Sequence, residues 1–133
     1  KPSNILFDKN NNIKITDFGM SIKQLDVNKD NHIVSDLFGT YVYNAPESLT
    51  DNYYSIYSDI YSLGIILFEL LNNFSTVMEK NIEINKMIQN GYSKTFVEQF
   101  ENESLFISKL IYKNPQSRML TDDILSLKIL FKE

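Results

Sequence analysis

Residues 58–71 read Ser-Asp-Ile-Tyr-Ser-Leu-Gly-Ile-Ile-Leu-Phe-Glu-Leu-Leu, and this stretch is apolar nearly all the way round when it is drawn as a helix. An amphipathic surface helix would carry a single apolar stripe, so the pattern predicts a helix that is buried on most of its faces. Asn72 and Asn73 follow the stretch and mark its end. We therefore expect the other elements of the chain to pack around this helix.

Two short runs with β-strand character, residues 5–8 and 13–16, precede this helix and are joined by Lys9-Asn10-Asn11-Asn12. A short polar turn between two such runs predicts a β-hairpin. Residues 17–47 show no sustained apolar period and carry scattered Asp, Ser, Thr and Gly, so we expect a long irregular loop there. Long loops in compact domains are usually functional or mobile.

Three further helices are predicted after the buried one. They cover residues 78–90 with Gly91 as the C-terminal stop, residues 103–112 before Asn114-Pro115, and residues 122–131 with Thr121 as the N-cap. The order of a hairpin, a loop and then helices predicts an α+β fold that is mainly helical. The chain shows no internal repeat and no domain boundary.

The overall composition excludes several classes of protein. The 133 residues are 43% hydrophobic and 23% charged, which suits one globular domain or part of one. The net charge of −4 argues against a surface that binds nucleic acid directly, and the absence of Cys excludes disulfides and thiolate metal sites. The longest apolar stretch, residues 65–71, is far shorter than the roughly 20 residues that cross a bilayer, so we expect no membrane contact by this segment.

Three short motifs occur in a fixed order: Lys1-Pro2-Ser3-Asn4, then Asp17-Phe18-Gly19, then Gly39-Thr40 followed by Ala45-Pro46-Glu47. Each motif is weak alone, because Asp-Phe-Gly can be a simple turn and a loop Asn is more often a backbone cap than a metal ligand. Two further features accompany the motifs in the sequence. A predicted hairpin lies between the first and second motifs, and a predicted irregular loop lies between the second and third. The joint occurrence of these features in this order argues against a chance set of turns.

This set of motifs resembles the protein kinase family over essentially the whole chain. Residues 58–64 look like the start of that family's buried central helix, and Pro115-Gln116-Ser117-Arg118 looks like the loop before its last helix. The resemblance implies a kinase-like fold in which residues 1–133 form a partial protein kinase domain, from the tail of the catalytic loop to the last helix of the large lobe, with the small lobe absent. The catalytic base would stand two residues before Lys1, so we expect these residues alone to be inactive.

The resemblance implies transfer of the γ-phosphate of ATP to a protein, with ATP and Mg²⁺ as cofactors. Mg²⁺ takes hard oxygen ligands, and Asp17 offers a carboxylate while Asn4 offers an amide oxygen. These two residues lie at the two ends of one hairpin and can converge at its mouth. Lys1 offers a mobile positive charge to the transferred group and favours a Ser/Thr kinase over a Tyr kinase, although an isolated Lys is otherwise a solvated surface residue.

Four more residues receive roles through the resemblance. Thr40 matches the threonine that bridges the catalytic aspartate and lysine, and is otherwise a turn residue. Glu47 and Arg118, the only Arg of the chain, match a buried ion pair that anchors the activation segment. Asp59 matches a carboxylate that holds the backbone of the catalytic loop by hydrogen bonds, and its alternative role is an ordinary helix N-cap.

The stretch Phe74-Ser75-Thr76-Val77-Met78-Glu79-Lys80 resembles the kinases that phosphorylate the alpha subunit of translation initiation factor 2, above all their endoplasmic-reticulum stress branch. This resemblance implies that subunit as the protein substrate, phosphorylation of Ser35 and Thr40, and a substrate-docking helix at residues 78–90. It also implies a cytoplasmic kinase domain, a full-length protein anchored in the endoplasmic reticulum membrane, and a homodimer.

The sequence departs from those kinases at two positions. Glu83 stands where relatives commonly have Thr, which bears on docking, and Met119 stands where a Pro usually follows the Arg. Two alternatives to this function stay open, namely a pseudokinase that acts as a scaffold and a Ser/Thr kinase of another subfamily. The residues before Lys1 would distinguish the pseudokinase from an active enzyme.

Overall fold

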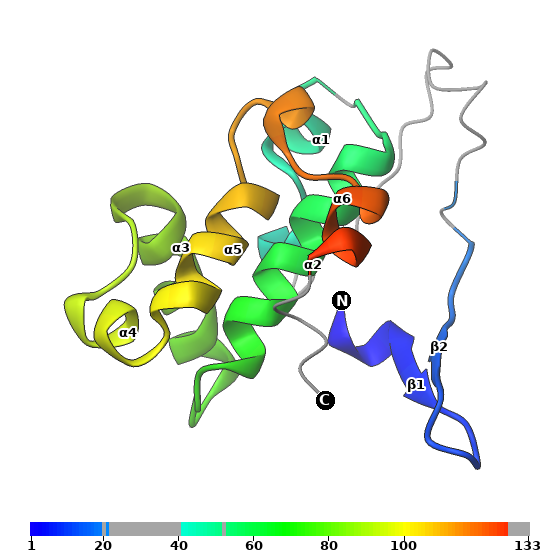
Figure 1. Cartoon of the computed structure of the whole chain (residues 1–133), viewed down its shortest axis with the longest axis horizontal. Coiled ribbons are helices and arrows are strands. Elements are labelled where there is room, and N and C mark those ends of the chain that lie inside the picture. Colours follow the sequence, from blue (N-terminus) through cyan, green and yellow to red (C-terminus); the bar gives the residue numbers. More distant parts are fainter. Residues whose placement is uncertain (20, 22–40, 52, 128–133) are drawn as a thin grey trace.

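The computed structural model describes residues 1–19, 21, 41–51 and 53–127. Within these ranges the chain forms a two-stranded antiparallel hairpin followed by helices, and Figure 1 shows the hairpin to one side of the helical body. The elements in order are the 3-10 helix η1 (Pro2–Asn4), strands β1 (Ile5–Phe7) and β2 (Ile13–Ile15), the 3-10 helix η3 (Tyr41–Tyr43), helices α1 (Pro46–Thr50), α2 (Ile56–Leu70), α3 (Val77–Asn90), α4 (Lys94–Gln99) and α5 (Glu101–Leu110), the 3-10 helix η4 (Pro115–Ser117) and helix α6 (Thr121–Ser126). The predicted α+β fold with a mainly helical body is confirmed.

Helix α2 is the central element, as its sequence predicts. Helices α3 and α5 and the short helices η3 and η4 pack against it, and its Ile65 is fully buried. The helix begins two residues earlier than predicted, because Ser55 is the N-cap and its backbone N–H donates to Ser58 Oγ at 3.3 Å. Gly64 lets α5 approach closely, since a Cβ at this position would lie only 2.5 Å from Cγ2 of Ile111.

The core between the C-terminal part of α2 and helix α4 contains a cluster of aromatic rings. Phe68 of α2 lies 5.0 Å from Phe96 of α4 and 6.1 Å from Tyr92, measured between ring centroids. Tyr92 and Phe96 are stacked at 5.3 Å. Ring contacts of this kind add to the stabilisation that comes from burying their area, so the cluster holds α4 and the end of α3 onto α2.

Helix α3 agrees closely with its prediction. Thr76 is the N-cap, and its hydroxyl accepts the backbone N–H of Glu79 at 3.0 Å. At the other end Gly91 adopts a φ of 83°, in the region that glycine reaches without a steric cost, and the helix stops there as expected.

Three helix predictions need correction. Helix α4 was not predicted, and α5 begins and ends two residues before residues 103–112. Helix α6 ends at Ser126, because Leu127 has extended backbone with a ψ of 107°, and residues 128–131 of the predicted helix lie outside the described residues. The N-cap of α6 is Leu120 rather than Thr121, and its backbone N–H donates to the carboxylate of Asp123 at 3.0 Å.

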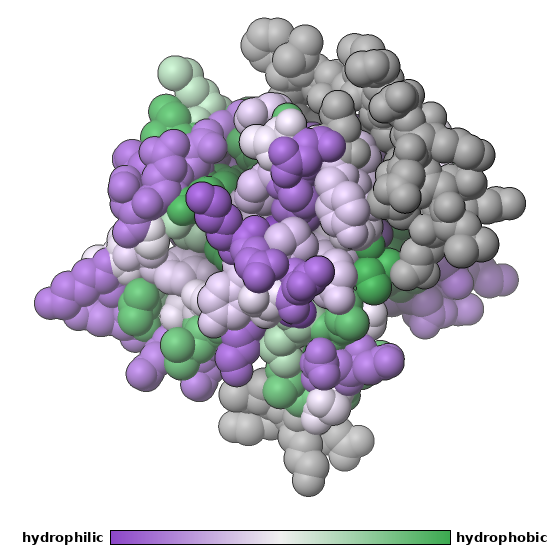
Figure 2. All heavy atoms as spheres, turned by 90° about the horizontal axis from the view of Figure 1, so that it is seen from above, coloured by the Kyte–Doolittle hydropathy of each residue, from purple (hydrophilic) through white to green (hydrophobic). Residues whose placement is uncertain are grey.

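The region predicted as one irregular loop, residues 17–47, contains helical structure in its described part. Residues 41–43 form η3, and α1 begins at Pro46. The face of the molecule in Figure 2 is mostly polar where it is not drawn in grey, with apolar side chains in small separate groups. Among the helices of the described residues, none has the length and apolar character that a membrane span requires.

Candidate active site

The hairpin brings Asn4 and Asp17 together. Its register pairs Ile5 with Ile15 and Phe7 with Ile13, and the backbone N–H of Thr16 donates to the carbonyl of Asn4 at 2.9 Å. With the open end of the hairpin held in this way, Nδ2 of Asn4 lies 3.5 Å from Oδ2 of Asp17. The two oxygen-bearing side chains predicted to converge at the mouth of the hairpin are therefore neighbours.

The closed end of the hairpin is organised by Asp8, which the sequence reasoning did not single out. Its carboxylate accepts the backbone N–H groups of Asn10 and Asn12 at 2.8 and 2.9 Å, and the side-chain amide of Asn12 at 3.1 Å. These hydrogen bonds lower the pKa of Asp8. Asn11 adopts a left-handed φ of 61°, which Asn tolerates better than most residues. The turn therefore fixes the register that carries Asn4 and Asp17.

Asp17 has an unusual backbone conformation. Its φ is 66°, in the left-handed region that costs a residue with a Cβ roughly 1–2 kcal/mol. Strained backbone of this kind concentrates at active sites, ligand clamps and switches, where the surrounding structure holds it in place. Asp tolerates this conformation better than most residues, so the strain is consistent with a functional position of Asp17 but the conformation also occurs in ordinary turns.

The donor set suits a magnesium ion that keeps water ligands. Asp17 supplies a carboxylate, and the amide of Asn4 can present its oxygen, because the two ends of an amide group are interchangeable by a flip. Within residues 1–19, 21, 41–51 and 53–127 no group of three or more His, Cys, Asp and Glu side chains could enclose a metal ion. Mg²⁺ is commonly held by one or two protein ligands together with substrate phosphates, so this pair is sufficient for that mode.

The other predicted active-site residues are placed as follows. Lys1 is exposed, and its carbonyl accepts the backbone N–H of Asn4 at 3.0 Å, which sets both residues on one turn of η1. Ser35 and Thr40 lie outside the described residues.

Asp59 is exposed and is not the helix cap, since Ser55 holds that position. Partial burial of its carboxylate raises the pKa of Asp59. Among the described residues no hydrogen bond reaches the Asp59 side chain, although part of it remains open to solvent. A role in holding the backbone before Lys1 stays a prediction.

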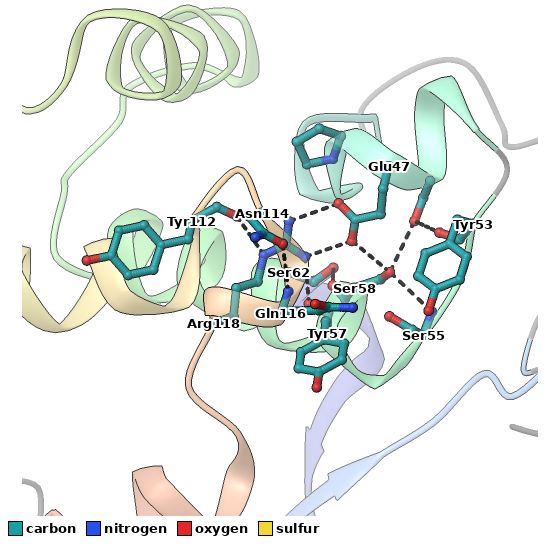
Figure 3. Close-up of polar contacts among 12 residues, drawn as sticks. Glu47, Tyr53, Ser55, Tyr57, Ser58, Ser62, Tyr112, Asn114, Gln116 and Arg118 are labelled. Atoms are coloured by element: carbon teal, nitrogen blue, oxygen red, sulfur yellow. Dashed lines mark hydrogen bonds and ion pairs between the residues drawn. The ribbon is translucent and has the colours of Figure 1, made fainter.

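Glu47 and Arg118 form a buried ion pair although 71 positions separate them (Figure 3). The Arg118 guanidinium donates to the two carboxylate oxygens of Glu47 at 2.7 and 2.8 Å, and the side chains are 0% and 9% exposed respectively. Burial raises the pKa of Glu47, but the hydrogen bonds from Arg118 outweigh this effect, and the pKa is lowered overall. The pair joins α1 to the segment that follows η4.

Arg118 makes two further hydrogen bonds, both to backbone carbonyls. Its Nε donates to the carbonyl of Tyr112 at 2.8 Å, and its Nη1 donates to the carbonyl of Tyr57 at 2.9 Å. Its guanidinium lies 4.9 Å from the ring centroid of Tyr61 on α2, a distance suited to a cation–π contact. Arg118 therefore ties three parts of the helical body together, and its role is structural.

Met119, one of the two departures from the resembled kinases, has a backbone function. Its N–H donates to the carbonyl of Lys109 near the end of α5 at 3.2 Å. A proline at this position could not make that bond, because proline has no N–H. The hydrogen bond gives a local reason for a residue other than proline after Arg118.

The sequence reasoning also missed a cluster formed by Tyr43, Glu69 and Lys80. These residues come from η3, α2 and α3, and their side chains are joined by hydrogen bonds of 2.5–3.0 Å. One signal was available in the sequence, namely a lysine in the first turn of a predicted helix, where the helix dipole disfavours a positive charge.

The structure has a two-stranded hairpin with Asn4 and Asp17 at its mouth and a helical body anchored by a buried Glu–Arg pair. The resemblance to protein kinases implies this arrangement. The chain matches the protein kinase domain family over residues 1–130. It therefore belongs to the protein kinase domain family.

Individual relatives agree with this assignment. The chain is 31% identical to "Eukaryotic translation initiation factor 2-alpha kinase 3" of Rattus norvegicus over 94% of its residues, and 32% identical to "Eukaryotic translation initiation factor 2-alpha kinase 1" of Plasmodium falciparum over 98%. It is 34% identical to "Calcium and calcium/calmodulin-dependent serine/threonine-protein kinase" of Pisum sativum over 95%. The chain spans 12%, 8% and 25% of the lengths of these relatives.

Proposed function

We propose that the full-length protein is a serine/threonine kinase that transfers the γ-phosphate of ATP to a serine of the alpha subunit of translation initiation factor 2. The observation that carries the catalytic part is the approach of Asn4 to Asp17 at the open end of the hairpin. The observation that carries the substrate part is the likeness to two kinases named for that factor.

The protein kinase family uses ATP and Mg²⁺, and in this chain Asn4 and Asp17 would hold the metal. Bound Mg²⁺ supplies positive charge to phosphate oxygens and orients them. Asp17 contributes the one negative charge of the pair, while Asn4 adds an oxygen ligand without a further charge. Lys1, exposed beside them, supplies a mobile positive charge to the transferred phosphoryl group.

The acceptor hydroxyl would be positioned by the segment that precedes Ala45. Thr40 is proposed to bridge the catalytic aspartate and lysine, and Ser35 and Thr40 are proposed sites of activating phosphorylation. A phosphate adds about −1.5 to −2 charge, which orders a loop where a cationic side chain receives it. Arg118 is the only Arg of the chain, and it is buried in its hydrogen bonds to Glu47, Tyr57 and Tyr112, so the receiving cation is a lysine or comes from residues outside this chain.

Helix α3 is the proposed docking surface for the folded substrate. Its Val77, Met78 and Ile82 are exposed, although each is apolar. Glu83, where relatives commonly have Thr, forms a 2.6 Å ion pair with Lys86 on the surface of the same helix, so this part of the surface carries charge in place of a hydroxyl. The docking contacts are therefore expected to differ in detail from those of the named kinases.

Localisation and assembly follow from the same likeness. We place the kinase domain in the cytoplasm, with the full-length protein anchored in the endoplasmic reticulum membrane and acting as a homodimer. A second candidate is a serine/threonine kinase of another subfamily, which the likeness to the Pisum sativum kinase favours. A pseudokinase scaffold is the third, and the paired Asn4 and Asp17 argue against it.

The test is phosphate transfer from Mg-ATP by the full-length protein to two substrates in parallel, the purified alpha subunit of initiation factor 2 and a generic basic protein. Strong transfer to the alpha subunit is expected. Transfer to the basic protein alone would keep the kinase and reject the proposed substrate, and transfer to neither would favour the pseudokinase.

A further inference from the structure

Tyr43, Glu69 and Lys80 form one connected polar cluster. The hydroxyl of Tyr43 donates to Oε2 of Glu69 at 2.5 Å, and Nζ of Lys80 donates to Oε1 of Glu69 at 3.0 Å and to the Tyr43 hydroxyl at 2.9 Å. The ammonium group also lies 5.5 Å from the centroid of the Tyr43 ring. Each of the three side chains therefore contacts both of the others.

The cluster is mostly shielded from water. Tyr43 is 3% exposed, and the side chains of Lys80 and Glu69 are 17% and 21% exposed. Burial lowers the pKa of Lys80, but its hydrogen bonds to Tyr43 and Glu69 outweigh this, and the pKa is raised overall. Burial raises the pKa of Tyr43, and its bond to Glu69 raises it further. The ammonium form and the neutral phenol are thus the favoured states.

The position of Lys80 is not explained by the needs of its own helix. It is the fourth residue of α3, where the partial positive charge of the helix N-terminus opposes a cation. The backbone there is already capped by Thr76, and the N–H of Ser75 donates to the Glu79 carboxylate at 2.8 Å. The favourable contacts of Lys80 are made outside α3, with Glu69 and Tyr43.

The cluster joins the two parts of the chain that the proposed function assigns to the substrate. Tyr43 lies three residues after Thr40, and its carbonyl accepts a hydrogen bond from Ser62 of α2 at 2.7 Å. On α3 the inward stripe is Lys80, Ile84 and Met87, and the last two are buried in the core. Met78 and Ile82, two exposed apolar residues of the proposed docking surface, lie on the opposite face of the same turns.

We propose that Lys80 is a positioning residue that fixes the first turns of α3 to the segment around Tyr43, so that a folded substrate bound on α3 meets the phosphate-acceptor site in one orientation. This inference rests on the proposed docking role of α3. A short peptide, which does not dock on α3, gains nothing from this geometry. An ordinary structural ion pair, by contrast, would affect both substrates alike.

The test uses the full-length protein with Lys80→Met, Lys80→Arg and Lys94→Met. Lys94 forms an ion pair with Glu98 at 3.5 Å within α4, is exposed and is not part of the Tyr43–Glu69–Lys80 cluster, so it serves as the matched control. The substrates are the folded alpha subunit of initiation factor 2 and a synthetic peptide that carries its acceptor serine. kcat and KM are measured separately for each.

We expect Lys80→Met to raise KM for the folded subunit about tenfold, with kcat and the peptide kinetics within about twofold of wild type, as for loss of a coupling contact. Lys80→Arg should recover most of the difference, and Lys94→Met should match wild type. An equal loss on both substrates, or no loss on either, overturns the inference.

Amide hydrogen exchange of the same full-length proteins gives a readout that needs no substrate. Lys80→Met should speed exchange in η3 as well as in the first turns of α3, whereas Lys94→Met should change neither. Faster exchange in α3 alone overturns the inference. If the wild-type protein does not phosphorylate the alpha subunit, the proposed function has failed at its substrate, and the exchange measurement then decides only whether Lys80 couples α3 to η3.

Discussion

Replacing Arg118 by Met should destabilise the kinase domain severely. The guanidinium is 0% exposed and makes hydrogen bonds at 2.7, 2.8, 2.8 and 2.9 Å to the Glu47 carboxylate and to the carbonyls of Tyr112 and Tyr57. Met fills part of the volume but supplies no donor. Among the side chains of the described residues, the Glu47 carboxylate would keep one hydrogen-bond donor, the hydroxyl of Ser58 at 3.1 Å.

The magnitude follows from leaving a buried charge without its partner. Such a loss costs about 3–5 kcal/mol of unfolding free energy, more than the net value of the pair itself. Because 1 kcal/mol shifts the midpoint of a domain of 150–250 residues by about 2–4 °C, the expected fall in Tm is about 6–20 °C. Arg118→Lys should fall between wild type and Met, since it keeps the charge but loses the two-pronged geometry.

The assay is urea and thermal unfolding of the complete kinase domain, with Lys94→Met as a surface-charge control. The double variant Glu47→Met with Arg118→Met completes the cycle. It should cost clearly less than the two single variants added together, because neither charge is then buried alone. A loss below about 1 kcal/mol for Arg118→Met, typical of an exposed pair, would refute the account of this anchor.

Three further predictions concern the helical body and its pH dependence. Gly64→Val should destabilise the domain by about 1–3 kcal/mol through overpacking, and Ile111→Ala in the same protein should relieve part of this, as urea unfolding would show. The folded-state pKa of Glu47 is lowered, so its contribution to stability is complete above its ordinary pKa of 4.5 and is lost as the pH falls through the folded pKa. The unfolding free energy of Glu47→Gln should therefore change less than that of wild type below this pH. Burial raises the pKa of Tyr61 to about 12, so an absorbance titration should show one fewer late-ionising phenol in Tyr61→Phe.

The parts of the structure that local pattern controls were predicted well. A polar four-residue turn between two short β runs gave the hairpin, and the hairpin alone brings Asn4 beside Asp17. The apolar run at 58–71 gave the central helix, and Gly91 gave the end of α3. In each case the deciding residues lie close together in the chain.

Contacts between distant residues were predicted only through resemblance or not at all. The 71 positions between Glu47 and Arg118 carry no periodic signal, and only the match to a known family paired them. The contact between Lys80 and Tyr43 was likewise not predictable from local sequence pattern, because the two residues are 37 positions apart. No pattern within one helix can show which distant side chain meets it.

Two local errors have physical causes. Helix α4 is only six residues long, too short to show a helical period, although the hydroxyl of Ser93 caps the N–H of Phe96 at 3.2 Å as a favoured N-cap residue should. The N-cap of α6 is Leu120 and not Thr121, although Thr is the preferred residue type at an N-cap. The carboxylate of Asp123 accepts a hydrogen bond from the Leu120 N–H. The Asp123 carboxylate at the third helical position thus supplies the cap that a side chain at the cap position usually provides.

The central claim is that Asp17 and Asn4 hold the metal for phosphate transfer. Its most direct test is the rate of phosphate transfer from Mg-ATP to the alpha subunit of initiation factor 2 by the full-length protein and by its Asp17→Ala variant. Asp122→Ala, which removes an exposed carboxylate from the first turn of α6, is the control. We predict a loss of at least about a hundredfold in Asp17→Ala with unfolding unchanged, and no loss in the control. Transfer by Asp17→Ala at a rate close to that of wild type would contradict the account.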